Sequence, residues 1–199
     1  MEYLVTMTTH VPDGASEQDV ADVRAREAAR THELASEGHV LRLWRPPLQP
    51  GEWRTIGLFA ADDSADLEVT LASMPLRVWR TDEITPLGRH PNDPGYGRTA
   101  IDPNGTEFLT TFLVTVPVGT SSATVDTTLR HEAEQARSLA DEGRLIRLWT
   151  LPGGRNLGHW QAGDSDGMQG IMQSLPMADW LTVDTVRLTR HPNDPGMKP

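Results

Sequence analysis

The two halves of this 199-residue chain are copies of one another, and this duplication constrains the fold more than any other feature. Three segments recur in the same order: EYLVT and EFLTT, EGHVLRLW and EGRLIRLW, and GRHPNDPG and TRHPNDPG. The copies are offset by 105 residues at Trp44 and Trp149 and by 101 further on, so one loop is four residues shorter. Residues 2–44 and 57–95 match their counterparts at 33 of 82 positions. The chain is therefore a tandem duplication of one module.

Each copy predicts the element order β-α-β-β-α-β. Residues 3–7 alternate in the period of a strand. Ser16 followed by Asp19 is a capping-box signal, after which helical spacing continues to Gly38. A strand, a Pro/Gly loop, a second strand, a short helix and a last strand follow. This order is typical of a ferredoxin-like fold, in which both helices cover one face of an antiparallel sheet.

We therefore predict an α+β protein with two ferredoxin-like modules, residues 1–95 and 107–199, joined by a linker at 96–106. The linker sequence, YGRTAIDPNGT, contains the glycine, proline and Asn-Gly pair of a turn. One such sheet leaves an apolar face bare, and a second like module can cover it. We expect the modules to pack as an internal pseudo-dimer, either face to face or edge to edge.

Composition excludes several classes of function. The chain has no cysteine, which rules out disulfides and thiolate chemistry, and its only lysine is Lys198. A net charge of -10 and scattered arginines argue against nucleic acid as a partner. No apolar run is long enough for a membrane span, and the start of the chain does not resemble a signal peptide, so a cytoplasmic location is expected. The seven histidines show no metal-ligand spacing, so we predict no metal site.

One glutamate in the first helix of each copy is the leading candidate for chemistry. Glu27 falls on the inward stripe that Val23 and Leu34 define, and Glu132 takes the matching place in the second copy. A carboxylate among apolar residues is expected to have a raised pKa, which suits a base that takes a proton from carbon. The structural alternative is an ion pair with an arginine such as Arg42.

The strand that follows the first helix supplies candidate substrate-binding residues. Arg42 and Trp44, like Arg147 and Trp149, lie on the same face of a strand by period two. An arginine beside an indole can hold a carboxylate or an enolate oxygen. A buried tryptophan covered by an arginine stem is the alternative interpretation.

Further candidates are less specific. Four other tryptophans could line a pocket for a planar ring or belong to the core, namely Trp53, Trp79, Trp160 and Trp180. We select Trp79 and Trp180 as candidate binding residues. His131 is a possible binding residue because it adjoins Glu132, although the first copy has arginine there. His90 and His191 read mainly as parts of an Asn/Asp-Pro turn that ends the last strand.

Taken together, these motifs resemble the muconolactone isomerases, small proteins of about one repeat in length. The shared features are the inward glutamate, an LWR strand motif, an LP-type pair before the final strand and a closing RHP. The resemblance implies a ferredoxin-like fold, higher oligomers, no cofactor and a double-bond shift in a butenolide. In that reaction a base removes the γ proton, a dienolate forms, and a proton returns to the α carbon. The chain departs from the family at Arg24, Leu129 and Thr150, which puts the substrate in doubt.

The sequence therefore favours an isomerase that acts by glutamate-mediated proton transfer on a small unsaturated lactone or a related carbonyl compound. Three alternatives stay open: a ring-forming or rearranging enzyme of specialised metabolism, a binding or scaffold module without catalysis, and a cofactor-free oxygenase of similar fold. Both glutamates are candidates for the catalytic group, and the sequence does not choose between the copies.

Overall fold

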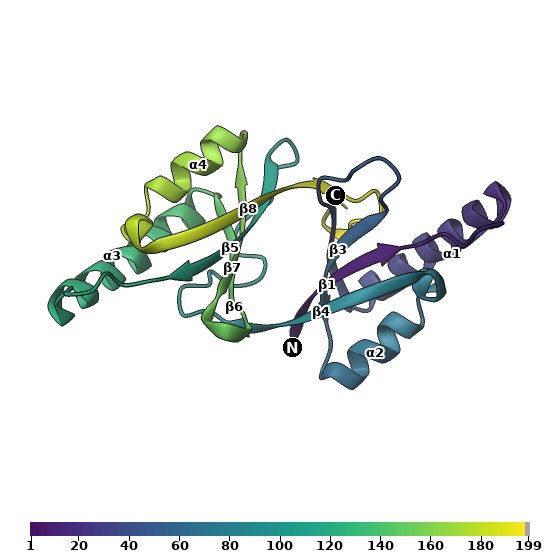
Figure 1. Cartoon of the computed structure of the whole chain (residues 1–199), viewed down its shortest axis with the longest axis horizontal. Coiled ribbons are helices and arrows are strands. Elements are labelled where there is room, and N and C mark those ends of the chain that lie inside the picture. The colour runs from purple at the N-terminus through teal and green to yellow at the C-terminus, as the bar shows by residue number, and fades with distance from the viewer. Residues whose placement is uncertain (198–199) are drawn as a thin grey trace. The chain divides into compact units, whose positions relative to one another are not determined.

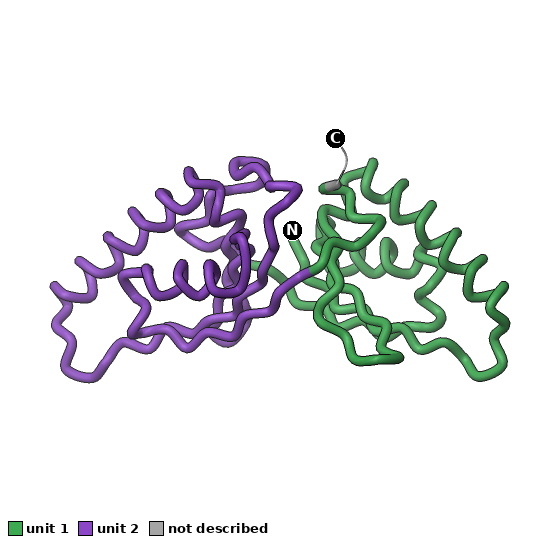
Figure 2. The backbone as a smooth tube through the Cα atoms, turned by 90° about the horizontal axis from the view of Figure 1, so that it is seen from above, with its two compact units in different colours: residues 1–87, 189–199 green, residues 88–188 purple. Residues whose placement is uncertain are grey.

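The structure, a computed structural model, describes residues 1–197 and divides into two compact units. Unit 1 contains residues 1–87 and the chain from Thr189 onward, and unit 2 contains residues 88–188 (Figure 2). Each unit is an α+β module with its own apolar core.

The first copy of the repeat forms the predicted series of elements. In chain order these are β1 (Glu2–Thr9), α1 (Glu17–Ser36), β2 (Val40–Arg45), β3 (Arg54–Ala60), α2 (Ser64–Ala72) and β4 (Arg80–Arg89). The strands are antiparallel in the order β4-β1-β3-β2. Leu34 of α1 and Leu67 and Leu71 of α2 share one buried apolar cluster with Tyr3 and Met7 of β1. Figure 1 shows the ribbons of both helices beside the strands of this sheet. The β-α-β-β-α-β prediction is confirmed.

The second copy repeats this architecture. Its elements are β5 (Thr106–Val114), α3 (Ser122–Asp141), β6 (Leu145–Thr150), β7 (Asn156–Ala162), α4 (Ser165–Gln173) and β8 (Leu181–Arg190). The strand order β8-β5-β7-β6 matches that of the first copy. None of the helices among residues 1–197 combines the length and the apolarity that a membrane span requires.

Local signals at the helix ends account for where the long helices begin. Ser16 caps α1, and the Asp19 carboxylate accepts from the Ser16 backbone N–H, which completes the predicted capping box.

Each short second helix is followed by a 3-10 turn that the sequence did not predict, η1 (Pro75–Trp79) and η3 (Ala178–Trp180). The backbone N–H groups of Leu76, in η1, and Met177, which caps η3, point at the two candidate glutamates.

The end of each copy belongs to the other copy's unit. In unit 1, Thr189 and Arg190 of β8 pair with β2. In unit 2, Gly88 and Arg89 of β4 pair with β6. The repeat boundaries at 1–95 and 107–199 therefore do not coincide with the compact units, because the HPNDP segments are exchanged.

An ion pair anchors each exchanged segment, fully buried in unit 1 and partly buried in unit 2. The Asp194 carboxylate accepts from Nε and Nη2 of Arg42, both at 3.0 Å, and from the backbone N–H of Leu43 at 2.8 Å. In unit 2, Asp93 accepts in the same way from Nε of Arg147 and from the backbone N–H of Leu148. A charge removed from water is retained only where such partners replace its hydration.

We expect Asp194→Asn to lower the free energy of unfolding by about 3 kcal/mol, because Arg42 keeps a buried charge and loses its carboxylate. Urea denaturation followed by circular dichroism measures the change. Asp141→Asn is the control, since its pair with Arg98 is solvent-exposed, and its effect should stay below about 1 kcal/mol. Equal losses in the two variants would show that Asp194 does not anchor the segment.

Candidate functional site

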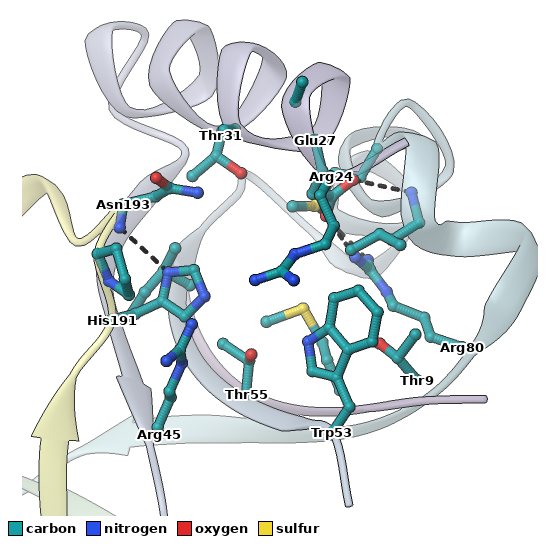
Figure 3. A pocket seen from close by; sticks show the side chains of 17 residues that line it. Thr9, Arg24, Glu27, Thr31, Arg45, Trp53, Thr55, Arg80, His191 and Asn193 are labelled. Carbon is teal, nitrogen blue, oxygen red and sulfur yellow. Dashed lines mark hydrogen bonds and ion pairs between the residues drawn. The ribbon is translucent and has the colours of Figure 1, made fainter. Parts of the chain in front are cut away.

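A cavity of about 290 Å³ lies in unit 1 between helix α1 and the sheet (Figure 3). Its size is at the lower end of the range for small-molecule sites, about 300–1,000 Å³. Strands β1, β2 and β3, the start of β4 and the exchanged segment His191–Asn193 complete its walls.

Glu27 enters this cavity from α1, and its inward orientation confirms the predicted stripe. The side chain is 8% exposed, together with Val23, Thr31 and Leu34 on the buried face of the helix. One carboxylate oxygen accepts from the Leu76 N–H at 2.8 Å, and the other accepts from Nη1 of Arg80 at 3.0 Å. The carboxylate is therefore held in one position at the cavity wall.

Burial raises the pKa of Glu27 above its usual value of 4.5. The Leu76 amide and the Arg80 guanidinium oppose this effect because both stabilise the carboxylate. The expected raised pKa is thus confirmed in direction, whereas a role for Glu27 in proton transfer stays a prediction.

Arg80 lines the cavity beside Glu27, and the sequence did not predict it as a site residue. It pairs with Glu27 and, through Nε at 2.8 Å, with Asp82 on the same strand. The ion pair that we considered for Glu27 therefore exists, but with Arg80 and not with Arg42. A position-by-position comparison of the copies could have found it, because Arg80 is replaced by Leu181 in the second copy.

Two more arginines make the cavity basic. Arg24 of α1 and Arg45 of β2 both line it, and the Arg24 guanidinium lies 5.2 Å from the centre of the Trp53 ring (Figure 3). Glu27 is the one carboxylate among the lining residues, against three guanidinium groups that include Arg80. In a chain of net charge -10, this local excess of positive charge favours an anionic ligand.

His191 reaches the cavity because the end of β8 belongs to unit 1. Burial lowers the pKa of His191 to about 4, and the nearby Arg45 and Arg24 contribute to this shift. Its Nδ1 accepts from the Asn193 backbone N–H at 3.2 Å, so the neutral ring carries its proton on Nε2. The imidazole is therefore a neutral hydrogen-bond donor at physiological pH.

A second cavity, of about 360 Å³, occupies the matching place in unit 2. Glu132 lines it and accepts from the Met177 N–H at 3.0 Å. Burial raises the pKa of Glu132, as it does for Glu27. The two glutamates are therefore equivalent in position, but the walls around them differ.

The strand residues that we selected for substrate binding lie elsewhere. Leu43 and Arg45 of β2 line the first cavity, so Arg42 and Trp44 project from the opposite face of that strand. The Arg42 guanidinium covers the Trp44 ring at 4.9 Å and pairs with Asp194. The predicted shared face is confirmed, but Arg42 anchors the exchanged segment, and neither residue lines one of the two cavities with the glutamates.

Arg147 and Trp149 make the same arrangement in unit 2, at 4.8 Å. The half-buried residues Trp79 and Trp180 end the two 3-10 turns and line neither of the two cavities with the glutamates. His131 is exposed on α3, one helical position away from Glu132. Helical geometry explains this last difference, because adjacent residues point about 100° apart.

Among residues 1–197, no three histidine, aspartate or glutamate side chains lie close enough together to hold a metal ion.

The fold and the site together define a duplicated α+β protein with one inward glutamate at a small cavity in each unit, buried in unit 1 and half-buried in unit 2. The chain belongs to the Muconolactone delta-isomerase family, whose model matches residues 1–93 and again 106–194. Muconolactone Delta-isomerase 1 of Acinetobacter lwoffii is 30% identical over 92 residues, which are 46% of this chain and 93% of that protein. The enzyme of Cupriavidus pinatubonensis is also 30% identical over 92 residues, 97% of its length.

Solved structures share the fold over nearly the whole chain. Chlorite dismutase from Candidatus Nitrospira defluvii superposes with a TM-score of 0.62 at 9% identity, covering 96% of this chain and 92% of its own. A heme-binding protein from Thermus thermophilus superposes with a TM-score of 0.61 at 11% identity, covering 97% and 93%. At such identities the likeness concerns the fold alone.

Proposed function

We propose that the chain is an isomerase that moves a double bond in a small unsaturated lactone bearing a carboxylate, and that unit 1 holds the active site. The observation that carries this proposal is a buried glutamate in a cavity whose other charged residues are three arginines. Family membership supports the reaction type, since relatives of about half this length are named muconolactone isomerases.

Glu27 is the proposed proton carrier. Its carboxylate takes the γ proton of the lactone, the electrons of that C–H bond enter the conjugated system, and a dienolate forms. The protonated Glu27 then returns the proton to the α carbon, so the product is an isomer and the enzyme is regenerated. A raised pKa brings the group closer to the pH at which it must both accept and donate a proton.

Positive charge and hydrogen-bond donors supply the remaining chemistry. A guanidinium from Arg24 or Arg45 can bind the substrate carboxylate at the mouth of the cavity. The Nε2–H of His191 can donate to the carbonyl oxygen of the lactone, where negative charge develops in the dienolate. Trp53 offers a flat apolar wall for the planar ring.

Solvent exchange tests this function with muconolactone as the first substrate. In D2O, proton NMR should show deuterium at the α carbon of the product while the double bond moves, because the proton on Glu27 exchanges with solvent. Absence of both isomerisation and deuterium incorporation, with muconolactone and with related carboxylated butenolides, would contradict the proposal.

The pH dependence should expose the link between Arg80 and Glu27. The rate of catalysis by a carboxylate base rises with pH through the pKa of that base, which gives the pH-rate profile an acid limb. For Glu27 this acid limb should lie above pH 4.5. Arg80→Leu, which installs the residue of the second copy, removes a charge that favours the carboxylate, so the limb should move to higher pH. Asp82 keeps Arg77 as a partner at 2.9 Å, so the fold should tolerate the change. A limb at unchanged pH would mean that Glu27 is not the titrating base.

A further inference from the structure

We infer that the cavity of unit 2 is a second binding site, specific for an uncharged, mainly apolar molecule of one or two rings with a hydroxyl or carbonyl group. This inference goes beyond the isomerase activity proposed for unit 1 and does not depend on it.

The lining of the cavity in unit 2 is more apolar than the lining of the cavity in unit 1. At four positions a polar lining residue of unit 1 is replaced by an apolar residue that lines the cavity of unit 2. The replacements are Thr9 by Val114, Arg24 by Leu129, Thr31 by Ala136, and Arg80 by Leu181. No lining residue of unit 2 is an arginine. A carboxylate that entered here would lose its hydration and find no cation.

The cavity of unit 2 has not been filled by larger side chains. It measures about 360 Å³, against about 290 Å³ in unit 1. Trp160 contributes a ring that is 3% exposed, and its Nε1 donates to the Thr110 hydroxyl at 2.8 Å. Because that hydrogen bond fixes the indole, the cavity presents a rigid flat wall.

The polar groups that the cavity of unit 2 retains include Glu132 and His90. Glu132 receives one hydrogen bond, from Met177, and no arginine or histidine forms an ion pair with it among residues 1–197. His90, from the exchanged segment, accepts from the Asn92 N–H at Nδ1 and so carries its proton on Nε2. One carboxyl group and one N–H donor in an apolar cavity can orient a single hydroxyl or carbonyl group.

Two probes of equal ring size separate this site from an anion site. 2-Naphthol is neutral at pH 7, and 2-naphthoate carries a carboxylate on the same rings. In isothermal titration calorimetry we expect the wild-type chain to bind one 2-naphthol per chain, and we expect that 2-naphthoate does not displace it. Glu27→Gln should leave this binding unchanged, which keeps the result independent of the isomerase proposal.

The double variant Leu129→Arg with Leu181→Arg gives the cavity of unit 2 the arginines that unit 1 has at the same positions. It should weaken 2-naphthol binding at least about 10-fold, because the bound probe would remove water from the two guanidinium groups. Leu129 is 48% exposed, so Leu129→Arg alone repeats the test at a position that tolerates a polar side chain. Val118→Arg adds the same charge to unit 2 on a fully exposed residue and should change the affinity less than about twofold.

Three outcomes would overturn the inference: no binding of 2-naphthol by the wild-type chain, equal affinity in Leu129→Arg with Leu181→Arg, or displacement by 2-naphthoate at equal concentration. Isomerase activity measured on the same variants should stay at the wild-type level, since both substitutions lie in unit 2. If these variants lose isomerase activity while 2-naphthol binding stays unchanged, the active site does not lie in unit 1. The same result would show that the cavity of unit 2 is not a separate site for an apolar molecule.

Discussion

Glu27→Gln is expected to lower kcat for isomerisation about 10²- to 10⁴-fold, the usual contribution of a general base. The amide keeps an oxygen that can accept from the Leu76 N–H, and Arg80 keeps Asp82 as its partner, so the variant should fold. Rates of isomerisation and of deuterium incorporation, measured at a pH above the acid limb, give the size of the effect.

Glu132→Gln is the matched control for that experiment. It makes the same chemical change at the equivalent helix position in unit 2, where the arginines are missing. We expect its kcat to stay within about threefold of wild type. A large loss in Glu132→Gln with an active Glu27→Gln would place the reaction in unit 2, and two fully active variants would exclude both glutamates as the proton carrier.

The double variant Arg24→Leu with Arg45→Thr is expected to lower kcat/KM for a carboxylated lactone about 10²-fold, since a hydrogen bond to a charged group contributes about 1.5–3 kcal/mol. Both new residues are those of the second copy at the same positions. Arg24 is exposed at the mouth and Arg45 is half-buried, so the loss should concern the substrate more than stability.

The methyl ester of the same lactone serves as the control substrate. The ester has no charge for the two arginines to bind, so its kcat/KM should change much less than that of the acid. The ratio of kcat/KM for the acid to kcat/KM for the ester should therefore be much smaller in the double variant than in the wild-type enzyme. If acid and ester lose activity equally, Arg24 and Arg45 act on the structure of the cavity and do not recognise the carboxylate.

Comparison of the two halves of the sequence was enough to find the duplication. The element order and the capping box at Ser16 follow from residues close together in the chain, and the structure confirms both. The inward orientation of Glu27 followed from helical period in the same way. Local geometry determines these features because hydrophobic period and backbone capping act over one or two helical turns.

The residues that surround the two glutamates depend on how distant parts of the chain come together in the fold. Period two placed Arg42 and Trp44 on one face of their strand but could not say which face borders the cavity. Arg80 lies 53 residues from Glu27 in the chain, and His191 reaches unit 1 only because the copies exchange their ends. Such contacts depend on which strands become neighbours, a property of the whole fold that no local pattern of residues encodes.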